Sequence, residues 1–435
     1  MDDSKQPPPD LPLQEAVARD LIPCSLCGAR GADVREVRGK PHFLCARCGA
    51  RSRRVGLLLA ALCVVALAAG GWFVLRRAAG VDATREGAGG IEPWLKETLD
   101  LMGEKRYPEA MDRISQRLKA EPDHAGIHGL LGQCLWNLSR YEEALASFRK
   151  AAGLDPERGE AWGVWIGSSL QKLGWSAEAL PQLQAPSALA PLERMRLESL
   201  LECLIDLERF DEALKMLDPD ARAGAHLRAR HRILSYQGKT DEARRLIEGL
   251  DSHQRGTLRA SELREAGDFE AAFGEVEALR GGHEPPAVQW MLAVRSELSV
   301  CAEAGDLERL DRAASRLSKV SDLQFRNTAI FYGALGGLMA GKPDAAKEAA
   351  REFTASTDAT YGPLRLERLM MRHLLGEVPT ADIEAEAGRV SRFLANDLYW
   401  YLALATGDKA WARKAADATP GRNFPYHAIR RLLKE

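Results

Sequence analysis

The stretch HAGIHGLLGQCLWNLSRYEEALASFRKAAGLDP, residues 124–156, contains the pattern that decides the fold. Its small and apolar residues recur at helical spacing in two runs, which a short polar turn separates. Gly132 and Ala144 are small enough to let the two helices approach closely, and Phe148 is large enough to reach a neighbouring hairpin. Pro156 follows the second run, where it would end a helix. The stretch therefore predicts two helices packed as a hairpin.

Similar units precede and follow this one, and the prolines that end them, Pro122, Pro156 and Pro191, are 34 and 35 residues apart. With this spacing the chain resembles the tetratricopeptide-repeat family. The residues that carry the resemblance are Trp94, Tyr107, Ala110 and Pro122, then Leu131, Gly132, Tyr141, Ala144, Phe148, Ala151 and Pro156, then Ile166, Gly167, Gly174, Ala179 and Pro191. The resemblance implies a solenoid that is stabilised by stacking, because no single hairpin buries its own apolar face.

Beyond Pro191 the family pattern weakens, but the rhythm of helix, turn and helix continues to the end of the chain. Turn signals recur at intervals of 29 to 38 residues, at Ser139, Gly174, Glu208, Gly238, Gly267, Gly305, Gly341, Gly376 and Gly407. We therefore predict an all-α fold over residues 91–435, a right-handed TPR-like α-solenoid of about ten helical hairpins. A capping helix over Asn423–Glu435 is expected to end it.

The composition is that of a globular protein, with 46% apolar residues, 28% charged residues and a formal net charge of -2. This balance argues against a protein that coats nucleic acid. The charge is unevenly distributed, since eight of the ten Lys and Arg residues among the first 54 residues fall between Arg30 and Arg54. The basic block lies next to the most apolar stretch of the chain.

That stretch, Val55–Leu75, is 21 residues without a charge, or about 31 Å of helix, which is enough to span a bilayer core. Arginines flank it at both ends, a pattern that does not favour a buried core helix or a cleaved signal peptide. Ser52-Arg53-Arg54 is also similar to a twin-arginine export signal, but the usual downstream residues are missing. The excess of bases before the span predicts a single-pass protein, in a bacterial inner membrane, with a cytoplasmic N-terminus and a periplasmic repeat domain.

Four cysteines, Cys24, Cys27, Cys45 and Cys48, have the spacing C-x2-C-x17-C-x2-C, and a glycine follows each pair. Four thiolates at tetrahedral positions suit a structural Zn²⁺ ion. Residues 22–50 resemble the zinc-ribbon family, which implies these four cysteines as the ligands, and residues 34–44 are expected to form a small hairpin that turns at residues 38–41. A redox dithiol pair and an iron or iron–sulfur site are alternatives.

The remaining cysteines are scattered, and we interpret Cys134, Cys203 and Cys301 as small buried apolar residues. His124 and His128 lack the glutamate of an HExxH motif, and no other catalytic motif is present, so we predict a protein that is not an enzyme. The family resemblance implies a concave surface on the first helices of the hairpins that binds peptides or proteins. The residues predicted to face this groove are Gln133, Trp136, Asn137, Gln171, Lys172, Glu198, Glu202, Asp206, Arg228, Arg232 and Tyr236.

We expect a disordered N-terminus over residues 1–20, a zinc ribbon with a basic stretch over 21–54, the membrane span over 55–75, a flexible linker over 76–90 and the repeat domain over 91–435. The leading hypothesis is a membrane-anchored scaffold that binds protein or peptide partners, with no role for nucleic acid. The alternative is a transmembrane sensor whose zinc ribbon contacts nucleic acid or the transcription machinery. A third hypothesis is an enzyme hidden in the diverged hairpins beyond Gly282.

Overall fold

The computed structural model describes residues 33–37, 40–44, 92–217, 224–248, 250, 252–281, 283, 285, 287–356, 364–418 and 426–434. Contacts along the backbone divide the chain into two units, Met1–Arg77 and Ala78–Glu435. The four predicted zinc ligands, the predicted membrane span and the predicted linker lie outside the described residues. Within the described ranges, no helix is both long and apolar enough to cross a bilayer.

In the first unit, strands β1 (Asp33–Val37) and β2 (Lys40–Leu44) pair in antiparallel fashion, with Asp33 opposite Leu44 and Val37 opposite Lys40. The predicted hairpin is therefore present, but the predicted turn at residues 38–41 was too long. Lys40 and Pro41 belong to β2. A two-stranded sheet consists only of edge strands, where a proline can be accommodated without the loss of a ladder hydrogen bond.

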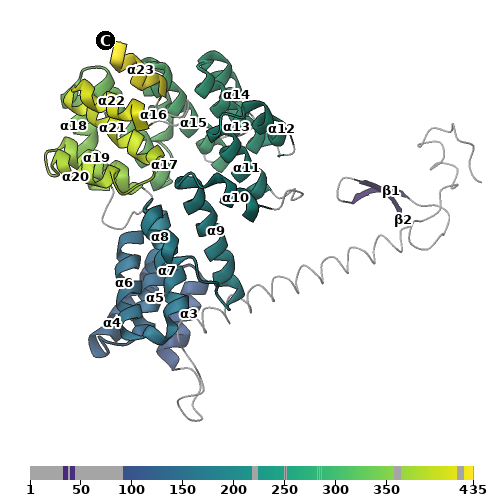
Figure 1. Cartoon of the computed structure of the whole chain (residues 1–435), viewed down its shortest axis with the longest axis vertical. Coiled ribbons are helices and arrows are strands. Elements are labelled where there is room, and N and C mark those ends of the chain that lie inside the picture. The colour runs from purple at the N-terminus through teal and green to yellow at the C-terminus, as the bar shows by residue number, and fades with distance from the viewer. Residues whose placement is uncertain are drawn as a thin grey trace, which may run out of the picture. The chain divides into compact units, whose positions relative to one another are not determined.

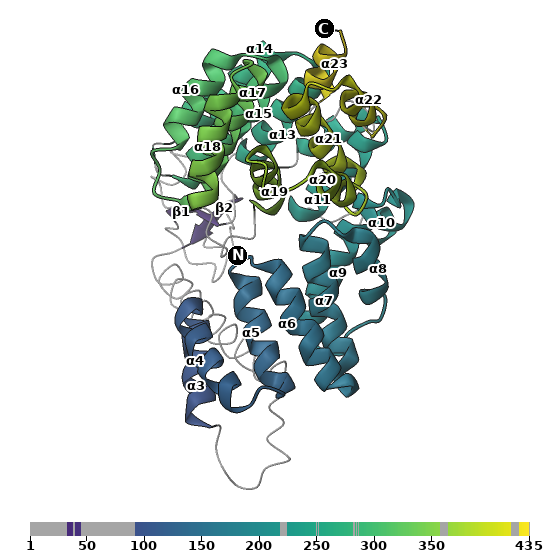
Figure 2. The same ribbon diagram turned by 90° about the vertical axis from the view of Figure 1, so that its left-hand side faces the viewer.

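In the second unit, the described residues form ten helical hairpins, as the sequence predicted. Figures 1 and 2 show successive hairpins lying next to one another. The first five are α3 (Pro93–Gly103) with α4 (Tyr107–Ala120), α5 (Ala125–Asn137) with α6 (Tyr141–Leu154), α7 (Gly159–Lys172) with α8 (Ser176–Gln182), α9 (Ala190–Asp206) with α10 (Phe210–Met216), and α11 (Gly224–Tyr236) with α12 (Thr240–Ile247). A short 3-10 helix, Pro156–Arg158, joins α6 to α7.

The next five hairpins follow the same order and lead to one final helix. They are α13 (Ser252–Ala266) with α14 (Phe269–Gly281), α15 (Val288–Ala304) with α16 (Leu307–Leu317), α17 (Leu323–Met339) with α18 (Pro343–Ser356), α19 (Arg365–Leu374) with α20 (Thr380–Ala387), and α21 (Arg392–Thr406) with α22 (Lys409–Ala418); α23 (Tyr426–Lys434) comes last.

The turn inside each hairpin depends on one residue with left-handed backbone geometry. All nine turn residues predicted from the sequence have a positive φ, between 58° at Glu208 and 83° at Gly267. Seven of the nine are glycines, which adopt this conformation without the steric cost of a Cβ atom. The turn of the first hairpin, at Lys105, also has a positive φ and was not predicted. The regular spacing of these glycines in the sequence therefore predicts where the hairpins turn.

Packing within and between hairpins follows the positions that the sequence singled out. A Cβ atom added to Gly132 would lie 2.6 Å from the Phe148 ring, so only glycine allows α5 to approach α6 this closely. The Phe148 ring is fully buried and stacks on Trp165 of the next hairpin, with ring centroids 5.1 Å apart. Cys134, Cys203 and Cys301 are buried and free, as predicted.

The C-terminal hairpins do not only stack on their neighbours in sequence but also contact much earlier turns. Trp175, in the turn after α7, donates a hydrogen bond from Nε1 to Glu386 Oε1 at 2.7 Å. The Arg389 guanidinium lies 3.5 Å from the centre of the Trp175 ring and pairs with Glu178 at 2.9 Å. Arg365 donates to the carbonyl oxygen of Leu173. These residues are about 200 positions apart, and we call their interface the closing contact.

The closing contact continues to the turns of the next two hairpins. Arg392, at the start of α21, pairs with Glu208 at 2.8 Å, and the Phe393 ring stacks on Tyr236 with ring centroids 4.0 Å apart. A solenoid held only by nearest-neighbour stacking has no such contacts. The C-terminal helices therefore form part of the surroundings of α7, α9 and α11.

Helix α23 contacts turns further along the same series. Its backbone N–H at Ala428 donates to Glu303 Oε2 at 2.9 Å, and Arg431 donates to the Ala302 carbonyl oxygen at 3.0 Å. The His427 ring lies 3.1 Å from the carbonyl oxygen of Glu265. The sequence predicted a cap with a polar face, but Ile429 of α23 is buried. The helix covers the end of the last hairpin and also binds the ends of α13 and α15.

Candidate functional site

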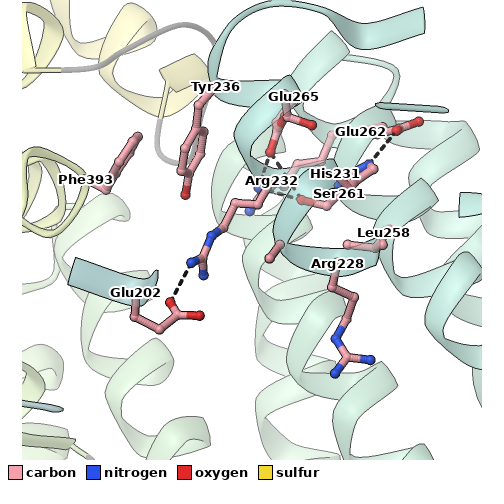
Figure 3. A pocket seen from close by; sticks show the side chains of 13 residues that line it. Glu202, Arg228, His231, Arg232, Tyr236, Leu258, Ser261, Glu262, Glu265 and Phe393 are labelled. Carbon is pink, nitrogen blue, oxygen red and sulfur yellow. Dashed lines mark hydrogen bonds and ion pairs between the residues drawn. The ribbon is translucent and has the colours of Figure 1, made fainter. Parts of the chain in front are cut away.

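A hollow of about 530 Å³ lies between the first helices of three hairpins, α9, α11 and α13, with Phe393 of α21 at its edge (Figure 3). We call it the α9–α13 hollow. Its size is in the range of sites that bind small ligands or short peptide segments. Because Phe393 comes from α21, residues from distant parts of the chain line one space.

Most charged groups of the hollow are paired across neighbouring helices. Arg232 pairs with Glu202, and the His231 ring nitrogen Nε2 lies 2.8 Å from Glu262 Oε1. These pairs link α11 to α9 on one side and to α13 on the other, as the dashed lines in Figure 3 show. The pairs hold their side chains in fixed positions, which is favourable for recognition because less side-chain entropy is lost on binding.

Arg228 is the exception among these charged groups. It is exposed, lies one turn before Arg232 on α11, and makes no hydrogen bond or ion pair with any described residue. In Figure 3 its guanidinium extends away from the pairs around it. A guanidinium with five unused N–H donors is suited to a carboxylate on a ligand. Arg228 is therefore the group of the hollow that is best placed to recognise charge.

Aromatic rings supply the apolar part of the site. The rings of Tyr236 and Phe393 are nearly parallel, at 19° to each other, and Phe393 comes from α21. Burial raises the pKa of Tyr236 to about 12, so its hydroxyl group stays neutral and can both donate and accept hydrogen bonds at any physiological pH. Burial also raises the pKa of Glu265, which lines the hollow.

The structure brings four of the predicted groove residues together in the hollow: Glu202, Arg228, Arg232 and Tyr236. Asp206 lies beside them at the end of α9, where it accepts a hydrogen bond from Ser176 Oγ at 2.7 Å. Burial raises the pKa of Asp206 to about 6, even though that hydrogen bond opposes the shift.

The other predicted groove residues lie away from the hollow, on α5, α7 and the first part of α9. Gln133 is only 1% exposed, and neither polar atom of its amide has a partner among the described residues. The Trp136 ring packs edge-on against Trp165 and Tyr141. Asn137 donates to the Gln133 carbonyl oxygen at 2.8 Å. Gln171 is half-buried, whereas Lys172 and Glu198 are exposed.

Sequence reasoning did not nominate His231, Ser261, Glu262, Glu265 or Phe393 for the site. Two of these could have been found, because the turn residues Gly238 and Gly267 are one hairpin apart, and the same interval carries Arg232 to Ser261 and Tyr236 to Glu265. For Phe393 no sequence signal exists, since its place depends on the closing contact.

The isolated histidines have structural roles. The His124 ring caps the start of α5 by accepting from the Ile127 N–H, and the His128 ring lies 2.8 Å from the Pro122 carbonyl oxygen. Among the described residues there is no group of His, Cys, Asp and Glu side chains that could hold a metal ion. The four predicted zinc ligands fall outside those residues.

Comparisons with known proteins agree with the repeat pattern. Residues 101–165 match the tetratricopeptide-repeat family, and no curated protein matches the chain. Similar solved structures include the TPR domain of P58(IPK), 15% identical with a TM-score of 0.23 over 79% of this chain and 98% of that one. Others are the APC/C hetero-tetramer Cut9–Hcn1, 14% identical with a TM-score of 0.33 over 77% and 73%, and yeast Tom70, 11% identical with a TM-score of 0.30 over 78% and 93%.

TM-scores this low do not establish a shared arrangement of whole chains. The assignment of the fold therefore depends on the family match and on the hairpins themselves. The repeat pattern at residues 101–165 coincides with α3 to α7, and hairpins of the same kind continue to α22. The described part of the second unit is therefore an all-α, TPR-like solenoid of helical hairpins, and its residues 101–165 match the tetratricopeptide repeat.

Proposed function

We propose that this protein is a membrane-anchored, non-catalytic scaffold that binds a segment of a partner protein in the α9–α13 hollow. The observation that carries the proposal is the unpaired Arg228 guanidinium at a hollow whose other charged groups are held in place by ion pairs. A partner segment with an acidic side chain would meet Arg228, and its apolar part would contact Tyr236 and Phe393. Proteins with tetratricopeptide repeats suit this role because their hairpins present long surfaces.

Photo-crosslinking in living cells tests this proposal. A photoreactive amino acid is placed at Ser235, which lines the hollow, and in a control protein at Lys347, which is exposed on α18. We expect covalent adducts with a specific protein from position 235 and none from position 347. The change Arg228→Glu should remove the adducts, because it replaces attraction for an acidic partner by repulsion.

The proposal is wrong if position 235 gives no adduct, or if its adducts persist unchanged with Arg228→Glu. The matched control is Arg245→Glu on α12, which changes the same charge at an exposed position outside the hollow. This control should leave the adducts in place.

We also propose that Val55–Leu75 anchors the chain in a bacterial inner membrane, with the repeat domain in the periplasm. The support is the uncharged run of 21 residues and the arginines on both sides of it. An alkaline phosphatase fused after Glu435 should be active, because that enzyme requires the oxidising periplasm. Activity of a cytoplasmic reporter at the same position would contradict the proposed topology.

For the N-terminal unit we propose a structural zinc site formed by Cys24, Cys27, Cys45 and Cys48. The donor set fits Zn²⁺, and the pairing of Asp33 with Leu44 supports the proposal because it brings the segments that lead to the two cysteine pairs to the same end of the hairpin. The purified chain should contain one zinc ion per molecule. Cys45→Ser should lose the zinc ion, whereas Cys301→Ser should keep it.

A further inference from the structure

A second hollow, of about 210 Å³, lies between the second helices of two consecutive hairpins, α14 and α16. We call it the arginine hollow. It is separate from the α9–α13 hollow, which is lined by first helices and by α21. Four arginines line it: Arg280 from α14, and Arg309, Arg312 and Arg316 from α16.

One buried carboxylate positions two of these arginines. Glu297 of α15 is 6% exposed, and each of its oxygens accepts from a different guanidinium: Oε2 from Arg280 Nη1 at 2.9 Å and Oε1 from Arg316 Nη2 at 2.7 Å. A buried carboxylate with both oxygens occupied fixes the guanidinium groups that hold it. Glu297 therefore orients Arg280 and Arg316 but neutralises only one of their two charges.

Several of the remaining donors are unused, although Arg280 also pairs with Glu277 at 3.3 Å. Arg316 Nε is buried and has no hydrogen-bond partner among the described residues. The Arg309 guanidinium lies 3.9 Å from the centre of the Phe273 ring and has no carboxylate partner in the described part of the chain. Arg312 is paired only with Glu308, at 3.6 Å, and both side chains are largely exposed, so that water screens the pair.

The balance of charge in the arginine hollow is positive. Its lining contains four arginines but only two carboxylates, Glu297 and Glu277, and Glu277 is 76% exposed. Stacking on Phe273 holds Arg309 in one plane while leaving the edge of its guanidinium available to a ligand. The hollow therefore combines excess positive charge with fixed, unsatisfied N–H donors.

We propose that the arginine hollow binds a phosphate group. A carboxylate is satisfied by a single guanidinium fork, whereas a phosphate presents three acceptor oxygens that can be shared by Arg309, Arg312 and Arg316. The phosphate group is either free inorganic phosphate or a phosphate monoester. The site lies outside the surface on which the proposed partner binds, so it adds a second ligand to the molecule.

Isothermal titration calorimetry of the full chain in a nonionic detergent tests the proposal, with inorganic phosphate and phenyl phosphate as probes and acetate as the comparison, all at constant ionic strength. We expect saturable binding of a phosphate probe. Arg309→Gln and Arg316→Gln should each weaken it by about tenfold or more. Tighter binding of phenyl phosphate identifies a monoester site, and tighter binding of inorganic phosphate identifies a site for the free ion.

A matched control separates loss of this site from a general loss of positive charge. Arg351→Gln removes an exposed arginine from α18, the second helix of another hairpin, and should leave phosphate binding unchanged. If Arg316→Gln lowers the melting temperature, its weaker binding could reflect a loss of structure. Arg309→Gln then provides the test of the phosphate contact, because Arg309 has no buried ion pair to lose. Absence of saturable binding, equal binding of acetate, or an unchanged affinity in Arg309→Gln would overturn the proposal.

Discussion

At the scale of single residues, the buried carboxyl group of Glu303 links α15 to the last helix, α23. Glu303 is 1% exposed and receives the Ala428 N–H at the start of α23, and burial raises its pKa to about 7. In the sequence it is one acidic residue among many on a helix. Its role depends on α23, which reaches it from 125 residues away.

Glu303 makes the stability of the repeat domain depend on pH. Its pKa is raised from 4.5 to about 7, so the folded state holds a proton that the unfolded state has released in this range. The free energy of unfolding should therefore decrease by about 3 kcal/mol as the pH rises from 4.5 to above 7. In Glu303→Gln this part of the decrease should be missing, which denaturant unfolding at pH 5 and pH 8 measures.

The comparison of wild type and variant isolates the effect of Glu303. Other groups with a raised pKa, such as Asp206, are present in both proteins, so their contributions to the pH dependence cancel. The amide oxygen of glutamine can still accept a hydrogen bond from the Ala428 N–H. The free energy of unfolding of the variant should therefore differ from that of the wild type by an amount independent of pH, apart from the missing titration of Glu303. Parallel pH profiles of the two proteins would show that Glu303 is not the titrating group.

Glycine positions provide a second test at this scale. Gly132→Ala should destabilise the protein by about 1–3 kcal/mol, because its new Cβ atom would lie 2.6 Å from the buried Phe148 ring. Gly153→Ala in the partner helix is the matched control, since no atom lies within 4 Å of its new Cβ. The control should be neutral or more stable by about 0.5–1 kcal/mol, because alanine favours helix. Thermal melts that rank the two variants the other way would contradict the packing described here.

At the scale of helices and hairpins, the sequence predicts what is local. The positions from Ser139 to Gly407 predicted nine turns, because left-handed geometry at a helix end favours glycine wherever the hairpin lies in the fold. The strands β1 and β2 could also be predicted, because the pattern that indicates a short hairpin is local in the sequence. By contrast, α21 and α23 carry no residue pattern that specifies contact with the ends of α7 to α15, since such contacts depend on how the stacking of ten hairpins accumulates.

The predicted groove shows the same division. Four of the residues that the family resemblance placed in the groove, Glu202, Arg228, Arg232 and Tyr236, line the α9–α13 hollow. Phe393 was beyond reach because it is 157 residues from Tyr236 in the sequence. Gln133, which the resemblance also placed in the groove, is only 1% exposed.

Removal of α23 should affect specific earlier helices. A chain that ends at Pro425 loses the hydrogen bonds of Ala428 and Arg431 to α15 and the buried side chain of Ile429, and should be less stable by about 2–4 kcal/mol. Hydrogen exchange should become faster at the ends of α13 and α15 and remain unchanged in α5 and α6. Exchange that changes only in α21 and α22 would mean that α23 is a simple cap.

At the scale of the whole molecule, the C-terminal hairpins contact the turns after α7 and α9 and the end of α11, and Phe393 of α21 supplies one edge of the α9–α13 hollow. A solenoid of independent stacked hairpins would leave that surface open. The closing contact gives the hollow a fixed boundary, with the stacked rings of Tyr236 and Phe393 at its edge.

Crosslinking across the closing contact tests this claim most directly. Glu178→Cys and Arg389→Cys replace a surface ion pair that joins residues 211 positions apart. The native thiols Cys134, Cys203 and Cys301 are buried, and Cys24, Cys27, Cys45, Cys48 and Cys63 are replaced by serine in all variants so that they cannot react. We predict that a short bismaleimide joins the two new cysteines within one chain, whereas a control pair of Glu178→Cys with Lys347→Cys does not react. Failure of the first pair to crosslink, or equal crosslinking of both pairs, would contradict the account.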